Sequence, residues 1–322
     1  MKKVTRREFI KTGASFVAVC GLTGCDQTTE PPIVAGNPMP TRAFGKTGFN
    51  VGLFSLGGQA ALETPGQEDL SEEIINRALD LGVNYIDTSA YYGRELAQMG
   101  LSERNIGRVM KSRRDDVFLA TKSLGRTYNS AMTDLEQSLT NRQTDHVDLW
   151  QMHNIRTIDD FASVFTPNGA MKAFEQAKTE GTTRFIGVSG HFDPTVLGTM
   201  IDYAEFDTVL MALNAADIHY KSFIKLALPT AVQLEMGVIA MKIPARGRLF
   251  QEGGITTMEQ ALGYTLTHPV STAIVGCSSV ADVENNVELA RNFTPYSEDE
   301  MKELEALTAS NYWEGGFFKF EW

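Results

Sequence analysis

Cysteine is scarce in this chain and the few histidines are scattered, which together exclude several kinds of site. Only three cysteines occur among 322 residues, and none of the five histidines has a cysteine or another histidine two to four residues away. Protein zinc sites draw on closely spaced thiolate and imidazole ligands. The sequence therefore predicts no metal site.

Two glycine-containing motifs are also missing. No GxGxxG turn follows any strand-like run, which argues against a Rossmann dinucleotide-binding domain. No GxSxG nucleophile elbow is present, which argues against a serine hydrolase built on that turn. No internal repeat, low-complexity tract or second domain is apparent.

Positive charge is in short supply, since the formal net charge is −11 at pH 7. An acidic surface repels the phosphates of nucleic acids and of anionic lipid headgroups, so no nucleic-acid partner is expected. The first 24 residues are an exception, because their basic residues outnumber the acidic ones.

These first residues have the features of an export signal. The paired arginines Arg6 and Arg7 precede a moderately apolar run at 14–22, which is too short for an ordinary membrane-spanning helix. The pattern resembles a bacterial twin-arginine signal, which implies export of the folded protein by the twin-arginine machinery. The alternative is a cytoplasmic tail with arginines paired by chance.

The stretch LTGC at 22–25 resembles the lipobox of bacterial lipoproteins. It implies a signal peptide at 1–24 that is cleaved before a lipidated Cys25, and a polar, proline-rich tether that extends to residue 40. Asp26 then favours anchoring at the inner membrane, on the periplasmic or another extracytoplasmic face. The alternative is a plain secreted protein. With Cys20 removed and Cys25 lipidated, only Cys277 remains, so no intramolecular disulfide is expected.

From residue 41 onward, short β-branched runs alternate with amphipathic segments, a pattern that predicts a parallel sheet. Eight such alternations favour a closed (β/α)8 TIM barrel over 41–322, with an N-terminal hairpin turning at 45–48 and an extra C-terminal helix at 297–308. Strands are expected at 53–56, 84–87, 117–121, 147–151, 184–188, 208–213, 238–242 and 272–275. Helices are expected at 71–81, after a cap at Ser102, and at 129–139, 171–178 and 194–203.

Four chemically active side chains stand where strand-like runs end. Asp87 ends one run and Tyr92 follows five residues later, Lys122 ends the next run, and His153 ends the one after that. In a parallel barrel the carboxyl ends of the strands converge on one mouth, where the chemistry is done. We therefore expect these four side chains to meet.

Together they suit the reduction of a carbonyl group, which needs a proton donor beside the developing alkoxide. Tyr92 is predicted as the acid and base, and the Lys122 ammonium is expected to lower the pKa of its phenol. Asp87 supplies the counter-ion of Lys122. His153 orients the carbonyl oxygen. Singly, each residue also has an ordinary structural explanation.

The order and contexts of these residues resemble the aldo-keto reductases, whose tetrad is Asp, Tyr, Lys and His. The resemblance runs from about residue 41 to about residue 307. Tyr91 is a competing phenol, but the five-residue gap from Asp87 and the following Gly93 favour Tyr92. The resemblance implies an NAD(P)-dependent oxidoreductase that interconverts an aldehyde or ketone and an alcohol, with the hydride supplied by the cofactor.

The resemblance is weaker around the nicotinamide. Ser189 matches a residue that binds the carboxamide, but Gly190 stands where asparagine is usual and Leu210 where glutamine is common. Met241 takes the place of the aromatic residue that stacks on the ring; sulfur can also pack there, and ordinary barrel packing is an equal alternative.

The remaining cofactor contacts are implied along the last two strand ends, with Ser278 also able to cap the helix there. Asp282 stands where relatives often carry an arginine for the 2′-phosphate, so the sequence favours NAD and leaves NADP open. Asp282 could equally be a solvated helix residue. The implied contacts are Lys242, Arg246, Gly276, Ser278, Asn285 and Asn286.

For the substrate, a small carbonyl or alcohol, Asn154 follows the tetrad histidine where relatives often carry tryptophan, and 154–169 could form a substrate loop. The aromatic tail at 311–322 either closes over the mouth or packs on the barrel exterior. Two other functions stay open: a non-catalytic binding or scaffold protein, and a barrel lyase or hydrolase. A cofactor bound before export would be retained tightly.

Overall fold

The computed structural model describes residues 38–320. The predicted signal peptide at 1–24, the predicted lipidation site Cys25 and nearly all of the tether that extends to residue 40 lie outside the described residues, as do 321–322. Within the described part, no helix is both long enough and apolar enough to cross a bilayer.

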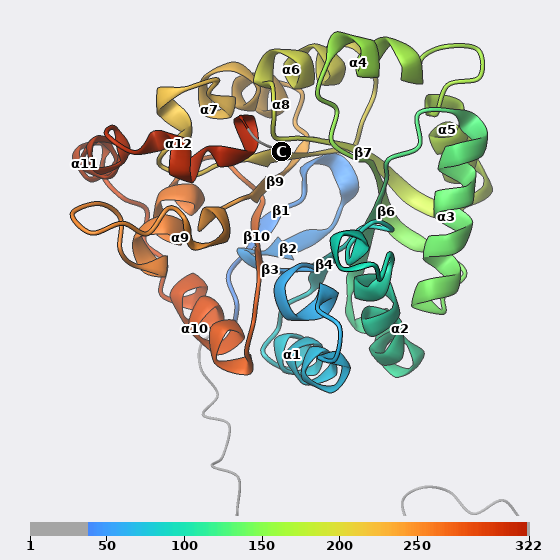
Figure 1. The fold of residues 1–322 in the computed structure, drawn as a ribbon, viewed down its shortest axis with the longest axis horizontal. Coiled ribbons are helices and arrows are strands. Elements are labelled where there is room, and N and C mark those ends of the chain that lie inside the picture. The colour runs from blue at the N-terminus through green and yellow to red at the C-terminus, as the bar shows by residue number, and fades with distance from the viewer. Residues whose placement is uncertain (1–37, 321–322) are drawn as a thin grey trace, which may run out of the picture. The chain divides into compact units, whose positions relative to one another are not determined.

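Eight parallel strands form a closed barrel, which confirms the predicted fold class (Figure 1). The strands follow one another in chain order, and the last pairs with the first to close the sheet. They are β3 (Phe54–Gly57), β4 (Tyr85–Asp87), β5 (Phe118–Ser123), β6 (Val147–Met152), β7 (Thr183–Gly190), β8 (Thr208–Ala212), β9 (Gly237–Met241) and β10 (Thr272–Gly276).

Helices surround the barrel and cover its apolar outer surface (Figure 1). In α1 (Glu68–Asp80), which confirms the helix expected at 71–81, Ile74, Ile75, Ala78 and Leu79 are buried at helical spacing. The other helices between strands are α2 (Leu101–Arg113), α3 (Tyr128–Arg142), α4 (Ile158–Val164), α5 (Met171–Glu180), α6 (Pro194–Tyr203), α7 (Phe223–Leu226), α8 (Leu228–Gln233) and α9 (Met258–Thr267). Helices α10 (Val280–Arg291), α11 (Glu298–Thr308) and α12 (Tyr312–Gly315) follow the last strand.

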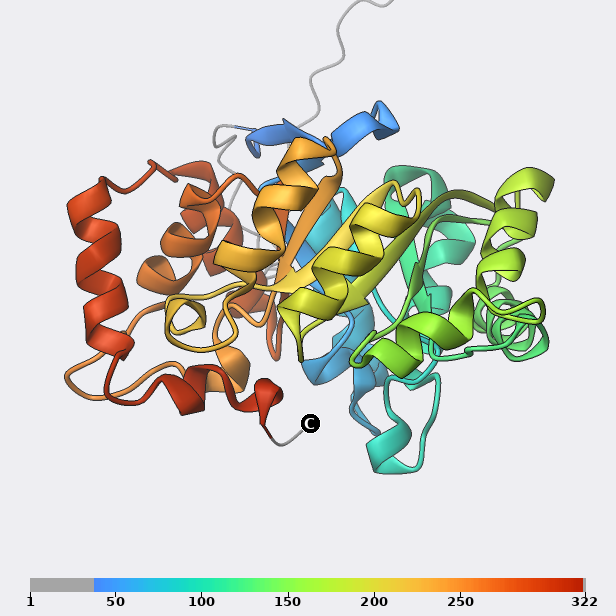
Figure 2. The same cartoon turned by 90° about the horizontal axis from the view of Figure 1, so that it is seen from above.

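An N-terminal hairpin of β1 (Thr41–Ala43) and β2 (Asn50–Gly52) covers the amino ends of the strands (Figure 2). Phe44 in its turn inserts into the barrel, where its ring meets Tyr85 at 5.5 Å and Phe118 at 5.4 Å, centroid to centroid. A β-carbon on Gly45 would lie 2.2 Å from a backbone nitrogen, so the turn needs glycine. This apolar layer fills one end of the barrel and leaves the carboxyl ends of the strands for polar groups.

Two predicted helix caps were wrong by one or two residues. Ser102 lies inside α2, where its hydroxyl is 2.8 Å from that of Thr88, and Gly100 with a φ of +75° precedes the helix. Ser279 rather than Ser278 caps α10, in a capping box with Asp282. Glycine suits the left-handed conformation before α2, and the Ser279 hydroxyl is the one that accepts from the Asp282 amide at the start of α10.

The aromatic tail packs beside the loop that follows β8. In the 3-10 turn Phe317–Lys319, the ammonium of Lys319 forms a buried ion pair with Asp217 and donates to the carbonyl oxygen of Tyr220 at 2.8 Å. Phe318 is buried with its ring 5.9 Å from that of His191. The tail therefore lies behind one wall of the barrel mouth.

Candidate active site

The four residues predicted from strand ends meet at the carboxyl end of the barrel. Asp87 ends β4, Lys122 lies in β5, His153 follows β6, and Tyr92 lies in the loop after β4. The Lys122 ammonium forms an ion pair with Asp87 Oδ2 and donates to the Thr88 carbonyl at 2.7 Å and to Tyr92 Oη at 3.3 Å. Both members of the ion pair are 1% exposed. The ammonium thus links the carboxylate to the phenol.

Asp87 is held from its other oxygen by a residue that the sequence did not single out. Gln151 in β6 donates from Nε2 to Asp87 Oδ1 at 2.7 Å, while the Tyr85 hydroxyl lies 3.5 Å from the same oxygen. A buried carboxylate needs such partners, because an unpaired buried acceptor is costly. In the sequence, Gln151 stands directly before Met152, the last residue of β6, on the side of the strand that faces the inside of the barrel. That position is the only sequence signal that could have singled it out.

The pKa of Tyr92 is raised, because burial outweighs the opposing effect of the Lys122 ammonium. The expected net lowering was therefore wrong: the ammonium acts in the predicted direction but does not dominate. For Lys122, burial disfavours the charge, yet Asp87 and then Tyr92 outweigh it and raise the pKa. The site accordingly holds a protonated phenol beside an ammonium.

His153 is a neutral imidazole in this environment. Burial and the nearby Lys122 charge lower its pKa well below 6.5. Its Nδ1 lies 3.2 Å from the hydroxyl of Ser89, and its ring stands edge-on to that of Tyr92 at 6.1 Å between centroids. Arg126 fixes the backbone here, donating to the carbonyls of His153 and Asn154 at 2.9 and 3.0 Å.

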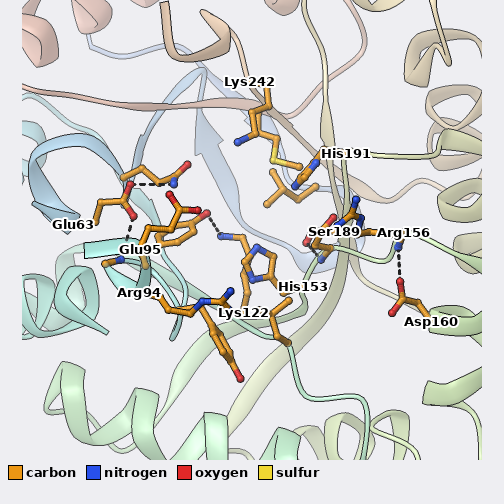
Figure 3. A pocket seen from close by; sticks show the side chains of 18 of the residues that line it. Glu63, Arg94, Glu95, Lys122, His153, Arg156, Asp160, Ser189, His191 and Lys242 are labelled. Carbon is orange, nitrogen blue, oxygen red and sulfur yellow. Dashed lines mark hydrogen bonds between the residues drawn. The ribbon is translucent and has the colours of Figure 1, made fainter. Parts of the chain in front are cut away.

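A central cavity of about 420 Å³ opens onto these groups. Figure 3 shows Lys122 and His153 beneath it, with Glu63 toward one side and Arg156 toward the other. Tyr91 also lines it, but its hydroxyl donates to Asp134 at 3.2 Å, so Tyr92 is the phenol that Lys122 reaches. Arg156 and Asp160 come from the predicted substrate loop at 154–169, whereas the sequence did not point to Gln59, Glu63, Arg94, Glu95, Leu124, Arg126 and His191.

An adjoining cavity of about 660 Å³ shares a wall with the central one. Tyr92, Met241 and Lys242 line both, so the two cavities lie side by side, one at the tetrad and the other reaching the start of α10. The volume of the adjoining cavity, and a lining that runs from the ends of β9 and β10 to the first turns of α10, suit an extended dinucleotide. Seven of the eight predicted cofactor contacts line it: Met241, Lys242, Arg246, Gly276, Ser278, Asn285 and Asn286.

The eighth predicted cofactor contact, Ser189, lines the central cavity together with Asn154. The Ser189 hydroxyl donates to the Met152 carbonyl at 3.2 Å and accepts from the Asn154 backbone at 2.9 Å. Asn154 has a φ of +54°, a left-handed conformation that asparagine tolerates. Ser189 therefore also joins β7 to the end of β6. Leu210 is fully buried in the cavity wall.

At the far end of the adjoining cavity, Asp282 is engaged by the backbone. Its Oδ2 accepts from the amides of Ser278 and Ser279 at 2.8 and 3.0 Å. Asn286 is buried, with Nδ2 3.6 Å from Cys277 Sγ, whereas Asn285 is exposed. Within residues 38–320, no group of three potential metal ligands gathers anywhere.

The buried imidazoles predict how stability depends on pH. His153 and His191 have pKa values well below 6.5 in the folded state, so the unfolded chain binds more protons as the pH falls through that value. Stability should therefore be full above about pH 7.5 and fall toward about pH 5.5. Melting temperatures across this range should fall less steeply in His153→Gln than in the wild type. The matched control is His146→Gln, outside both cavities; an equal slope in all three proteins would contradict the prediction.

Comparison with known proteins identifies the family. The model of the aldo/keto reductase family matches residues 50–252. An uncharacterized oxidoreductase of Bacillus subtilis, YqkF, is 26% identical over 316 residues, which cover 84% of this chain and 97% of the relative. An L-galactose dehydrogenase of Arabidopsis thaliana is 28% identical over 311 residues, which cover 83% of this chain and 93% of the relative.

Solved structures agree in fold. The holo form of an aldo-keto reductase from Bacillus halodurans superimposes with a TM-score of 0.69 at 27% identity, covering 84% of this chain and 96% of that one. An aldo-keto reductase of Klebsiella pneumoniae in complex with NADPH has a TM-score of 0.68 at 22% identity, and the match covers 84% of this chain and 95% of that one. With the family match extending over more than half of its length, the chain belongs to the aldo/keto reductase family and is an NAD(P)-dependent oxidoreductase.

Proposed function

We propose that the protein interconverts an aldehyde or ketone and an alcohol, with Tyr92 as the general acid and base. The observation that carries this is the contact of one buried ammonium, that of Lys122, with both Asp87 and Tyr92 where the two cavities meet. When bound, the nicotinamide supplies or accepts the hydride. In reduction, the carbonyl oxygen accepts hydrogen bonds from Tyr92 and His153 and takes the Tyr92 proton as its charge develops. Lys122 stabilises the phenolate that remains.

The residues of the two cavities would hold the cofactor in an extended form. Ser189 and Met241 would meet the nicotinamide, Lys242 and Arg246 the pyrophosphate, and the residues from Gly276 to Asn286 the adenosine. The sulfur of Met241 offers a polarisable surface in place of an aromatic ring. A non-catalytic role remains the second candidate, since Gly190 and Leu210 depart from the family pattern around the carboxamide.

NAD is the cofactor that we propose. Asp282 puts a carboxylate near the expected ribose, and no lysine or arginine is among the residues from Gly276 to Asn286 that line the adjoining cavity. A carboxylate repels a 2′-phosphate and can accept from a ribose hydroxyl. The Klebsiella relative binds NADPH, and a fission-yeast relative carries NADP(+) in its name. A preference for NAD would therefore distinguish this chain from both relatives.

We also propose export in the folded state, followed by anchoring through lipid on Cys25. Support comes from the sequence, where Arg6 and Arg7 precede an apolar run and a lipobox. Cofactor is plentiful where the protein folds and scarce outside, so a nucleotide bound before export and released slowly would serve successive substrates. Binding would also stabilise the fold by about 4 kcal/mol at 1,000 times the dissociation constant.

Replacement of Tyr92 tests the catalytic role. Tyr92→Phe should lower single-turnover hydride transfer by at least ~10²-fold with nucleotide affinity nearly intact, because only the transferable proton is lost. Tyr91→Phe is the matched control, since it removes the adjacent hydroxyl that binds Asp134. Normal turnover in Tyr92→Phe would contradict the role of Tyr92 as general acid and base. Absence of turnover in the wild type with every carbonyl tried would favour the non-catalytic role.

Nucleotide content tests the cofactor proposal. Protein purified from the exported fraction without added nucleotide, then denatured and chromatographed, should release near-stoichiometric NAD(H). Asp282→Arg should raise the affinity for NADP(H) relative to NAD(H), because it replaces a repelling charge with an attracting one. An empty protein that needs millimolar added nucleotide would contradict retention, and released NADP(H) would contradict the choice of NAD.

Intact-mass analysis tests the anchor. Membrane-fraction protein should begin at Cys25 with a diacylglyceryl group, and Cys25→Ser should be released or remain unprocessed. Cys277→Ser is the matched control, because Cys277 is buried in the barrel domain. A soluble mature protein that begins at another residue would rule out the lipid anchor.

A further inference from the structure

Two arginines line the central cavity without an ion pair. The guanidinium groups of Arg94 and Arg156 form no ion pair and no side-chain hydrogen bond within residues 38–320. The chain as a whole is acidic, with a net charge of −11, so unpaired cations here do not follow from a basic composition. Free guanidinium groups beside a reaction centre suit an anionic ligand.

The carboxylates that line the same cavity are already occupied or exposed. Asp160 uses Oδ1 for Arg126 at 3.2 Å and Oδ2 for the backbone amides of Arg156 and Thr157. Glu63 accepts from the Gly93 amide and from Gln59 at 3.2 and 3.1 Å. Asp160 therefore fixes the backbone of Arg156 while its guanidinium stays available.

Of the two arginines, Arg156 is the better placed for binding. It is half-buried, and its guanidinium lies over the ring of Phe192 at 4.5 Å from the centroid, a support that leaves its N–H edge unused. Arg94 is exposed on the 3-10 turn Arg94–Leu96. The charge of Arg156 also acts within the cavity, because after burial and Lys242 it lowers the pKa of His191, which lines the cavity.

We propose that Arg156 binds a carboxylate of the substrate, so that the preferred substrates are carbonyl or alcohol compounds that carry a carboxylate away from the reacting carbon. This rests on the proposed reaction, and it adds the substrate class. The reacting oxygen lies at Tyr92 and His153 and the carboxylate lies toward β7, where Arg156 offers two parallel N–H donors. Arg156 is thus a specificity residue that takes no part in proton transfer.

Paired substrates of nearly equal shape test this. With full-length mature protein and nucleotide, kcat/KM should be higher for 4-carboxybenzaldehyde than for methyl 4-formylbenzoate, and higher for 4-oxobutanoate than for its methyl ester. Arg156→Gln should lower kcat/KM for each acid by about 10- to 100-fold, mainly through KM, because a charge-assisted hydrogen bond is lost. The esters should change less than about threefold. Arg156→Lys should recover part of the lost kcat/KM, since lysine keeps the positive charge but lacks the two parallel N–H donors of the guanidinium.

Lys46→Gln is the matched control, because it also removes one positive charge but lies on the exposed hairpin at the other end of the barrel. Equal loss for acids and esters in Arg156→Gln, or equal loss in Lys46→Gln, would overturn the proposal while leaving the reaction intact. Calorimetric binding of 4-(hydroxymethyl)benzoate and of its methyl ester to protein loaded with the reduced nucleotide, which cannot accept hydride from an alcohol, gives an answer independent of turnover. Equal affinity for the two in the wild type would also overturn it.

Discussion

The buried ion pair of Lys122 and Asp87 is the interaction on which the site depends. Taking two charges out of water costs several kcal/mol per ion, and attraction offsets this only when the remaining hydrogen-bonding groups are satisfied. Here the ammonium has three acceptors, on Asp87, Thr88 and Tyr92, and the carboxylate has a second donor in Gln151. The pair is therefore satisfied by partners from two sources, Gln151 of β6 and the segment that follows β4, which carries Thr88 and Tyr92.

The barrel makes this arrangement possible by dividing its interior. The amino end is filled by an apolar layer in which Phe44 from the hairpin joins Tyr85 and Phe118. Water is kept from the ion pair on that side, which strengthens its electrostatic effect on Tyr92. At the other end the cavities open, so one face of the phenol meets the ammonium and the other meets bound molecules.

The fold could be predicted from the alternation of strand-like and helix-like segments, and the tetrad from strand ends together with the resemblance to the aldo-keto reductases, which selected Tyr92. Strands that alternate with helices form a parallel barrel, and strand ends then converge, so Asp87, Lys122 and His153 meet regardless of detail. Partners across strands could not be predicted. Gln151 contacts Asp87 through barrel register, and Arg126 reaches the His153 backbone through the path of a loop, neither of which any local pattern encodes. The pKa of Tyr92 likewise depends on burial, which is a property of the assembled site.

The central claim is that the Lys122 ammonium makes Tyr92 a usable acid and base, and the pH dependence of alcohol oxidation tests it most directly. This direction needs the phenolate, so the single-turnover rate should rise with pH until Tyr92 is ionised. In Lys122→Met the rise should shift to higher pH and the rate near neutrality should fall, since burial is then unopposed. An unchanged inflection in Lys122→Met, with nucleotide still bound, would contradict the claim.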